Sequence, residues 1–239
     1  MAVDDRRRHL HTSLRTSTWR GDERVALLSP TPNRPTPTAH DVALHLDGLR
    51  LRNTERVVTS ALHRHELEPF LANGFVEHER LHLLRHDLLR CPALRPDVPI
   101  RRGRRRDRDA VLALDARAFD DFWVLDSDGL DDAIHATPSS RFRVLGRRSE
   151  SVLGYSVTGI AARRGYLQRL AVDPLHQGRG LGRAMVAESL AELRRAGAVE
   201  ALVNTQERNQ RAYDLYVSCG FVPEPDWLTV LTYPLGSSS

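Results

Sequence analysis

The sequence Gln177-Gly178-Arg179-Gly180-Leu181-Gly182 follows a run typical of a buried strand, residues 166–172, and precedes a long run with helical periodicity. The three glycines therefore occupy a strand-to-helix turn. Glycines in alternate positions let the main chain approach a ligand closely, and a helix that opens at Gly182 presents unpaired N–H groups and the positive end of its dipole. These features predict a cradle for a pyrophosphate group.

Two common phosphate-binding motifs do not fit this turn. A Walker P-loop ends in Gly-Lys-Ser/Thr, and the sequence contains no lysine. A dinucleotide fingerprint has the spacing G-x-G-x-x-G, whereas the glycines here fall as G-x-G-x-G and Arg183 stands at the place of the third glycine. The turn instead resembles the Q/R-x-x-G-x-G/A motif of the GNAT superfamily (Gcn5-related N-acetyltransferases), which is met by Gln177, Gly180 and Gly182.

A second stretch downstream resembles the other signature of that family, a helix followed by a Gly-Phe turn. It reads Asn209-x-x-Ala212-x-x-Leu215-Tyr216-x-x-x-Gly220-Phe221. In the family, the Asn and the Tyr of this helix face the cofactor. Asn209 is also a favourable N-cap by residue type, and the two roles are compatible. Two motifs in the expected order, separated by one helix and one strand, support the resemblance together.

The resemblance implies an α/β fold in which helices flank a central twisted mixed sheet, and it implies acetyl-CoA as cosubstrate. Two neighbouring strands, residues 165–172 and 199–203, are expected to splay so that the cofactor enters between them. The residues expected to contact acetyl-CoA are Leu170, Ala171, Val172, Gln177, Gly178, Arg179, Gly180, Leu181, Gly182, Arg183, Asn209 and Tyr216. A main-chain N–H at the end of the first of these strands is expected to hold the thioester oxygen as it becomes negative.

The implied reaction is the transfer of an acetyl group to a primary amine, on a small molecule or at a protein amino terminus, by direct attack in a ternary complex. Tyr216 is expected to protonate the departing thiolate. The Leu-Ala-Val-Asp-Pro run at residues 170–174 resembles members that acetylate protein amino termini, such as the ribosomal-protein alanine acetyltransferases. The alternative is a catalytically silent module with an acyl-CoA-binding or regulatory role.

The general base is left open by the sequence. Several family members carry a glutamate on the strand at residues 165–172, but no acidic side chain lies there. A water held by Tyr166 or Gln168 is one candidate, and Glu207 or an acid within residues 120–132 is another.

The amino-terminal part contains a short echo of the second motif. Residues 70–76, Phe-Leu-Ala-Asn-Gly-Phe-Val, align with residues 216–222, Tyr-Val-Ser-Cys-Gly-Phe-Val. We therefore expect a degenerate partial GNAT-like domain at residues 1–97 before the catalytic domain at residues 98–239. Phe70 replaces the tyrosine and no glycine-rich cradle precedes it, so this half is not expected to bind acetyl-CoA. It is expected to cover a sheet edge or to wall a substrate cleft.

Within the catalytic part, the remaining pattern predicts a strand from Ile100 and a helix over residues 107–119, then strands over residues 142–145 and 152–160. Glu188, Glu192 and Arg195 are expected on the exposed side of the helix that opens at Gly182. Residues 227–233 are expected to form the closing strand of the domain.

Composition is compatible with a globular protein. The 239 residues are 41% hydrophobic. They include 35 arginines and 31 acidic residues, which gives a net charge of +4, and this positive excess suits an anionic cofactor. Cys91 and Cys219 are expected to be reduced thiols in a cytoplasmic protein. No signal sequence or membrane span is recognised. A homodimer is compatible with the sequence.

Two clusters of charged or titratable residues have simpler interpretations. His78, His82 and His86 recur every fourth residue, as metal ligands on a helix would, but a solvated face is preferred and no metal is expected. The arginine-rich residues 101–108 have the charge of an RNA-binding patch. Because no aromatic residues interleave with them and Asp107 and Asp109 dilute the charge, a solvated strand end is preferred and a nucleic-acid partner is not expected.

Overall fold

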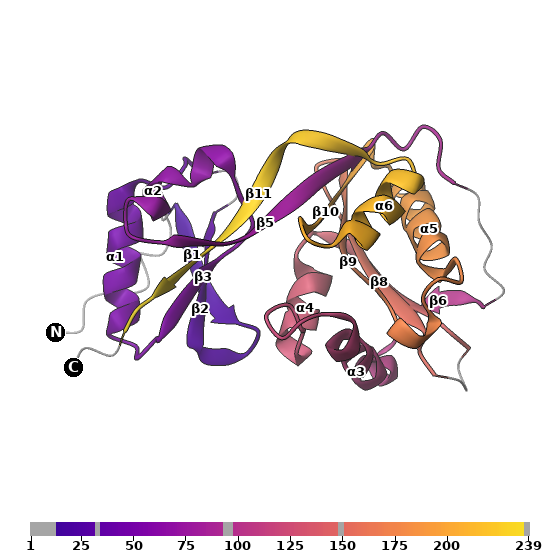
Figure 1. Ribbon diagram of the computed structural model, residues 1–239, viewed down its shortest axis with the longest axis horizontal. Coiled ribbons are helices and arrows are strands. Elements are labelled where there is room, and N and C mark those ends of the chain that lie inside the picture. Colours follow the sequence, from indigo (N-terminus) through magenta and orange to yellow (C-terminus); the bar gives the residue numbers. More distant parts are fainter. Residues whose placement is uncertain (1–12, 32–33, 93–97, 148–150, 237–239) are drawn as a thin grey trace. The chain divides into compact units, whose positions relative to one another are not determined.

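The computed structural model describes residues 13–31, 34–92, 98–147 and 151–236 (Figure 1). The chain forms two compact units. Unit 1 comprises Met1–Leu81 with Asp226–Ser239, and unit 2 comprises His82–Pro225. The strands β5 (Val76–His86) and β11 (Val222–Pro234) each have residues in both units. The division into functional domains at residues 97 and 98 stays a prediction.

Unit 2 contains the mixed sheet. Its strands are β6 (Ile100–Arg102), β7 (Ser139–Leu145), β8 (Gly154–Ala161), β9 (Arg164–Val172) and β10 (Glu200–Gln206), with the end of β5 beside β10. β6 to β9 pair antiparallel in chain order, and β10 runs parallel to β9. The first six residues of β8 are all buried, as expected for a central strand covered on both faces. The strands predicted from Ile100, over residues 142–145 and over residues 152–160 are confirmed within a few residues.

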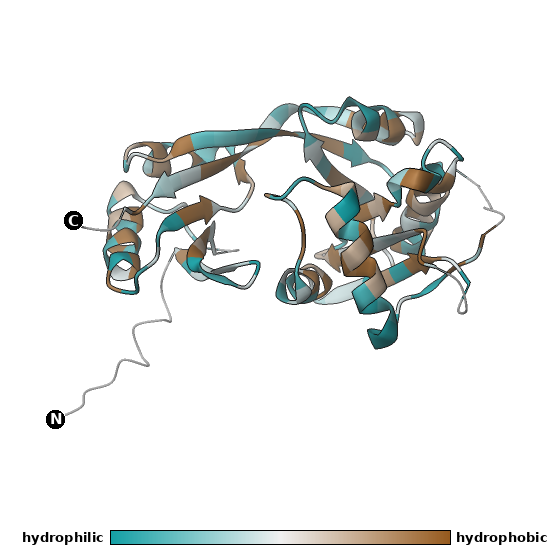
Figure 2. Ribbon diagram, turned by 60° about the horizontal axis from the view of Figure 1, so that its bottom comes forward, coloured by the Kyte–Doolittle hydropathy of each residue, from teal (hydrophilic) through white to brown (hydrophobic). Residues whose placement is uncertain are grey.

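Four helices cover this sheet. They are α3 (Arg108–Ala118), α4 (Ser127–His135), α5 (Leu181–Arg195) and α6 (Gln210–Ser218), and short 3-10 turns precede α3 (Arg105–Asp107) and α5 (Pro174–His176). One apolar cluster joins α3 and α4 to β7, β8 and β9, and another joins α5 and α6 to β10. Hydrophobic and hydrophilic residues alternate along the helices (Figure 2), so each helix turns its apolar side to the sheet.

The strands β9 and β10 pair over three residues only. The paired residues are Glu200 with Arg164, Ala201 with Gly165 and Leu202 with Tyr166, after which β9 continues to Val172 and β10 to Gln206. The register of β9 against β8 shifts at Val157 and Thr158, which leaves Gln168 as the extra residue of a β-bulge. Because a bulge bends its strand, it accounts for the separation from β10 that begins two residues earlier. The predicted splay is therefore present.

Unit 1 repeats part of this order. Its elements are β1 (Leu14–Trp19), β2 (Asp22–Pro30), α1 (Ala39–Arg50), β3 (Arg56–Thr59), β4 (Leu62–His63), a 3-10 turn (Arg64–Glu66), α2 (Glu68–Leu71), the start of β5 and the end of β11. β1 and β2 are antiparallel, and β2 runs parallel to β3 across α1, as β9 runs parallel to β10 across α5. The buried side chains of these elements form one core.

The sequence echo corresponds to the same local structure in both units. In unit 1, the N–H of Phe75 donates to the carbonyl of Phe70 at 3.2 Å, and Gly74 has a φ of 85°. In unit 2, the N–H of Phe221 donates to the carbonyl of Tyr216 at 3.1 Å, and the intervening glycine has a φ of 96°. The two aromatic rings of each turn pack edge to face. The expected partial repeat is supported by this shared helix, glycine turn and strand.

Four local expectations were wrong. The helix of the glycine turn begins at Leu181, one residue earlier than expected, and Glu192 is buried on it and pairs with Arg143 rather than lying exposed. The three histidines lie on the strand β5, and His86 is buried rather than part of a solvated face. The end of β11, expected to close the catalytic domain, pairs with β3 and β4 in unit 1.

Candidate active site

A cavity of about 310 Å³ lies in unit 2 between the end of β9, the glycine turn before α5, the end of α3 and the helix α6. Its lining contains eleven of the twelve residues expected to contact acetyl-CoA. The twelfth, Arg179, is exposed and lies outside the lining, although both of its glycine neighbours belong to it. The structure thus brings together the strand end, the glycine turn and the helix α6, which are separated in the sequence.

The glycine turn is shaped for close approach. Gly178 and Gly180 have φ values of 79° and 76°, and a Cβ atom at either would meet nothing within 4 Å. Gly180 is the N-cap of α5, and no side chain accepts a hydrogen bond from the helix start. Its first N–H groups and the positive end of the helix dipole are therefore available to an anion in the cavity.

Three other predicted residues hold the framework of the cavity. Gln177 donates its side-chain N–H to the carbonyl of Val172 at 3.0 Å, which ties the turn to the end of β9. Asn209 caps α6 by accepting the N–H of Ala212 at 3.0 Å. Arg183 donates to the carbonyl of Ser218 at 3.2 Å, which joins the start of α5 to the end of α6.

The main chain of β9 presents polar groups to the opening. The N–H of Asp173 bonds the carbonyl of Leu153, and hydrogen-bonded pairs alternate along an antiparallel ladder. Ala171 therefore directs its main-chain groups at β8, whereas Leu170 and Val172 direct theirs away from β8. The carbonyl of Val172 is taken by Gln177, which leaves the N–H of Val172 and both polar groups of Leu170 for a ligand.

Tyr216 lines the cavity from α6 and is 6% exposed. Its ring packs against Phe221 with a centroid distance of 5.6 Å. Burial raises the pKa of the phenol above its usual value of 10, the nearby Cys219 thiol adds to this rise, and the Arg169 charge opposes it. Its hydroxyl makes no hydrogen bond to any other residue that the structure describes. The phenol is therefore protonated at neutral pH and free to donate into the cavity.

The sequence missed several lining residues. Ala118 and Phe119 come from the end of α3, about fifty residues before β9, and no local pattern connects them with the glycine turn. Arg211 lies within the second motif at a position that the motif does not specify. With Arg183 it supplies the charge of the lining, which contains no carboxylate among the described residues. The cavity therefore suits an anionic ligand.

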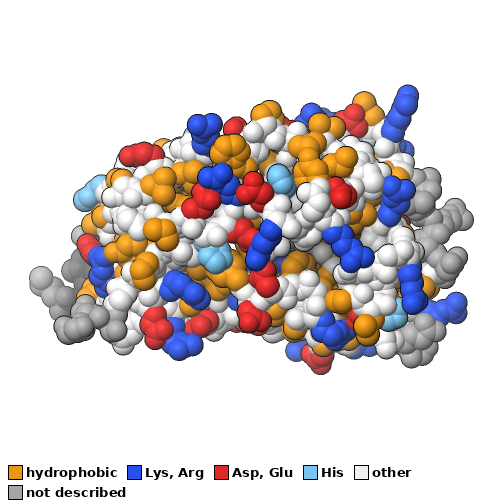
Figure 3. All heavy atoms as spheres, viewed as in Figure 1, with side chains coloured by type: hydrophobic (Ala, Val, Ile, Leu, Met, Phe, Trp, Pro, Cys, Tyr) orange, Lys and Arg blue, Asp and Glu red, His pale blue; other side chains and the backbone are white. Residues whose placement is uncertain are grey.

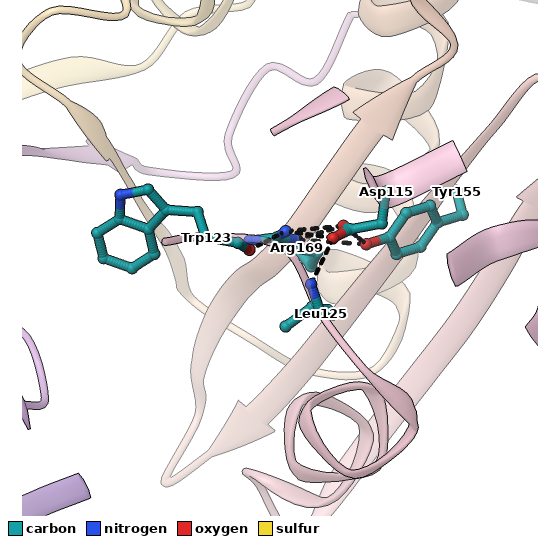
Figure 4. A network of polar contacts seen from close by, with 5 residues as sticks. All are labelled: Asp115, Trp123, Leu125, Tyr155 and Arg169. Atoms are coloured by element: carbon teal, nitrogen blue, oxygen red, sulfur yellow. Dashed lines mark hydrogen bonds and ion pairs between the residues drawn. The ribbon is translucent and has the colours of Figure 1, made fainter. Parts of the chain in front are cut away.

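A buried ion pair supports the α3 side of the cavity (Figure 4). The carboxylate of Asp115 is completely buried and accepts hydrogen bonds from Arg169 at 2.7 Å, from the N–H of Leu125 at 2.7 Å and from the hydroxyl of Tyr155. Arg169 also donates to the carbonyl of Trp123 at 2.6 Å. The sequence did not predict this network, because a single aspartate in an amphipathic helix reads as an exposed residue.

The same arginine holds a wall of the cavity. Its guanidinium lies 3.5 Å from the ring centroid of Phe119, which lines the cavity. Such stacking of a guanidinium on an aromatic face is attractive. Asp115 thus fixes Arg169, and Arg169 fixes Phe119 opposite α6.

None of the candidate general bases lies in the lining. Asp120 accepts hydrogen bonds from Arg208 at 2.6 Å and Gln206 at 3.4 Å, and Glu207 is exposed. The Oε1 atom of Gln168 is buried and has no hydrogen-bond partner among the described residues. An orphaned buried acceptor of this kind is a typical place for a bound water.

Among the described residues, no group of three histidine, cysteine or acidic side chains is placed to hold a metal ion. Cys91 and Cys219 are free thiols. No helix in the described part of the chain combines the length and apolar character that crossing a bilayer requires.

Comparison with known proteins gives matches over this same region. The profile of the Acetyltransferase (GNAT) family matches residues 108–221. A mycothiol acetyltransferase of Thermobispora bispora is 34% identical over 48% of this chain, and the match spans 43% of that relative's length. A ribosomal protein bS18-alanine N-acetyltransferase of Salmonella typhimurium is 29% identical over 38% of this chain and 70% of its own.

Two further matches extend over both units. A mycothiol acetyltransferase of Salinispora tropica is 27% identical over 95% of this chain and 81% of its own length. The solved structure of a tandem GNAT protein from the clavulanic acid biosynthesis pathway superposes with a TM-score of 0.65 over 95% of this chain and 79% of that one, at 15% identity. At that identity the likeness concerns the fold alone, and it confirms the fold class expected from the sequence.

Proposed function

Since residues 108–221 form an acetyltransferase domain of the GNAT family, we propose that the chain is an N-acetyltransferase that transfers the acetyl group of acetyl-CoA to a primary amine. The observation that carries the proposal is the cavity itself. It connects the uncapped amino terminus of α5 with the buried phenol of Tyr216, and its charged lining residues are two arginines.

In this proposal the pyrophosphate of acetyl-CoA binds the main-chain N–H groups around Gly180, and Arg183 and Arg211 add charge-assisted contacts. The pantetheine arm runs along β9 and bonds the free main-chain groups of Leu170 and Val172. It thereby fills the opening between β9 and β10 and brings the thioester to Tyr216.

The chemical step is a direct attack of the neutral amine on the thioester carbonyl. A main-chain N–H at the end of β9 stabilises the oxyanion of the tetrahedral intermediate. When this intermediate collapses, the C–S bond breaks and Tyr216 donates its proton to the leaving thiolate; the nitrogen of the new amide gives up its extra proton, which restores the phenol. The raised pKa keeps the phenol protonated at neutral pH, which a proton donor requires, and it also makes the phenol a weaker acid.

The amine must first lose a proton, because an ammonium has no lone pair for attack. The orphaned Oε1 atom of Gln168 favours a bound water over Glu207 or Asp120, and Gln168, like these acids, lies outside the cavity lining. The acceptor class, a small-molecule amine or a protein amino terminus, is proposed from the family and from the names of the relatives. A cytoplasmic location is likewise part of the proposal.

The test is acetyl-CoA consumption by the purified chain with a panel of small amines and amino-terminal peptides. With an accepted amine, Tyr216→Phe should lower kcat by about 10²- to 10⁴-fold and leave the Kd for acetyl-CoA within about threefold. Tyr213→Phe is the matched control, because Tyr213 lies on the same helix, packs on His82 and does not line the cavity. Unchanged turnover in Tyr216→Phe would remove that residue from the mechanism.

A second candidate function is a silent acyl-CoA-binding module, and the lack of a carboxylate in the described lining favours it. The same assay separates the two. Calorimetric binding of acetyl-CoA without consumption in the presence of any amine supports the silent module, whereas consumption with one amine rejects it. A lack of any heat of binding rejects both.

A further inference from the structure

A second and larger concave surface lies in unit 2, with a volume of about 1430 Å³. It is formed by the end of β6, the turn that follows, the first turn of α3, the helix α4 and the strand β7. Its described lining contains seven arginines and two aspartates, so positive side chains exceed negative ones by five. Figure 3 shows arginines and acidic side chains interspersed on the face that it draws.

Most of these arginines have no acidic partner. Arg108 pairs with Asp131 at 2.7 Å, and Arg143 pairs with the buried Glu192. The other five are exposed and form no ion pair with a residue that the structure describes; they are Arg102, Arg104, Arg105, Arg106 and Arg141. An accumulation of unpaired guanidinium groups around one concavity repels itself unless an anion occupies it.

An aromatic side chain lies among these arginines. Phe142 on β7 is half-buried and lines the same concavity. Its ring rests on Gly103, where a Cβ atom would come within 2.3 Å of a ring atom. The ring also packs edge to face on Tyr155, with a centroid distance of 6.4 Å, so one of its sides belongs to the hydrophobic core. Residues 101–108 alone lack an interleaved aromatic residue, but the pairing of β6 with β7 supplies one.

We propose that this arginine-lined concavity binds single-stranded nucleic acid. One small phosphorylated ligand would engage two or three guanidinium groups, and small-molecule pockets are usually about 300 to 1,000 Å³. Five unpaired arginines spread over a larger surface fit several phosphates along one strand. A single strand also exposes base faces for stacking on Phe142 and on guanidinium planes, which a duplex hides.

The proposal is independent of the acetyltransferase reaction. The two concavities meet opposite ends of α3, since Arg108 and Asp109 at its start line this one and Phe119 after its end lines the other. Variants of the arginine-lined concavity are therefore expected to bind acetyl-CoA as the native chain does.

The test is fluorescence anisotropy of the full chain with a labelled oligonucleotide of about 15 uridines, over about 50 to 200 mM salt. The variant Arg104→Gln/Arg105→Gln/Arg106→Gln should bind at least about tenfold more weakly at the lowest salt. Its slope of log K against log salt should be smaller by about 2, from three contacts at about 0.7 each. Thermal unfolding should show that the variant is folded.

The matched control removes the same charge elsewhere. Arg15, Arg52 and Arg90 are exposed and line neither concavity, so the variant Arg15→Gln/Arg52→Gln/Arg90→Gln should bind within about threefold of the native chain. Equal losses in the two triple variants would overturn the proposal, because they would show a nonspecific response to net charge.

Two further measurements test the nature of the ligand. Phe142→Leu, which keeps an apolar side chain, should weaken binding by about fivefold or more while the salt slope stays unchanged. Inorganic polyphosphate of equal charge should compete less well than the unlabelled oligonucleotide. Equal competition, displacement of the oligonucleotide by coenzyme A, or a lack of binding at the lowest salt would each overturn the proposal.

Discussion

The variant Asp115→Asn should destabilise unit 2 by about 3 to 5 kcal/mol. The side chain of Asp115 is 0% exposed, and that of its partner Arg169 is 11% exposed. The Nη2 atom of Arg169 lies 2.7 Å from the Oδ2 atom of Asp115. Asparagine has nearly the same shape, and its remaining oxygen can still accept the N–H of Leu125. The loss therefore comes chiefly from a buried guanidinium that keeps its charge and loses its counter-charge.

Urea unfolding measures this loss. In a background with Trp19 and Trp227 replaced by phenylalanine, the fluorescence of Trp123 reports on unit 2 alone. At a typical m value of about 2 kcal/mol per molar urea, the midpoint should fall by about 2 M. Asp109→Asn is the matched control, because Asp109 is exposed on the same helix and its replacement should change stability by at most about 0.5 kcal/mol.

A double-mutant cycle with Arg169→Met separates the ion pair from other effects. Because Asp115→Asn/Arg169→Met removes both charges, its cost should be smaller than the sum of the two single costs by about 2 kcal/mol. The reasoning is refuted if Asp115→Asn costs less than about 1 kcal/mol at an unchanged m value, or if the two single costs add.

Three other expectations concern the cavity and its counterpart in unit 1. Because burial raises the pKa of Tyr216 above 10, kcat/KM should rise with pH through the pKa of the acceptor amine without a falling limb below about pH 10; a falling limb at lower pH that Tyr216→Phe abolishes would contradict this. Gly180→Ala and Gly197→Ala should each cost about 1 kcal/mol in urea unfolding, because both glycines have positive φ and open surroundings. Only Gly180→Ala should weaken acetyl-CoA binding in calorimetry. Equal affinities of the two variants for acetyl-CoA would show that the glycine turn does not contact the ligand. Thr38→Ala should destabilise unit 1 by about 0.5 to 2 kcal/mol in thermal or urea unfolding, because its hydroxyl caps α1, and an unchanged stability would contradict the cap.

The sequence was sufficient for the features that depend on backbone conformation. Glycines at positive φ, an Asn at a helix start and apolar strand runs are local signals, and they located the turn, α6 and most strands. The β-bulge at Gln168 could not be predicted in this way. Its position depends on the pairing register between β9 and β8, and no sequence pattern within β9 indicates that register.

Features that depend on side chains from distant segments could not be predicted. Asp115 and Glu192 are charged positions on helices, and their burial becomes favourable only when Arg169 and Arg143 arrive from other elements. Phe119 joins the cavity for the same reason. Charge and periodicity assign such residues to the surface, since the partner that compensates for burial lies more than forty residues away.

The start of α1 shows how the echo in unit 1 differs from its counterpart. There the carboxylate of Asp41 accepts the N–H of Thr38 at 2.8 Å and the hydroxyl of Ser13 at 3.1 Å. The helix terminus is thus neutralised by an anion from its own chain. The start of α1 is therefore capped by side chains of its own chain, whereas no side chain caps the start of α5.

The early separation of β9 and β10 has a consequence for the sheet of unit 2. An interior strand that loses its neighbour halfway along its length has the unsatisfied amides of a sheet edge, although it lies in the middle of the sheet. An extended molecule inserted there completes the sheet as a surrogate strand. The sheet is therefore completed only when a ligand is bound, and β9 and β10 should be more rigid in the bound form than in the free form.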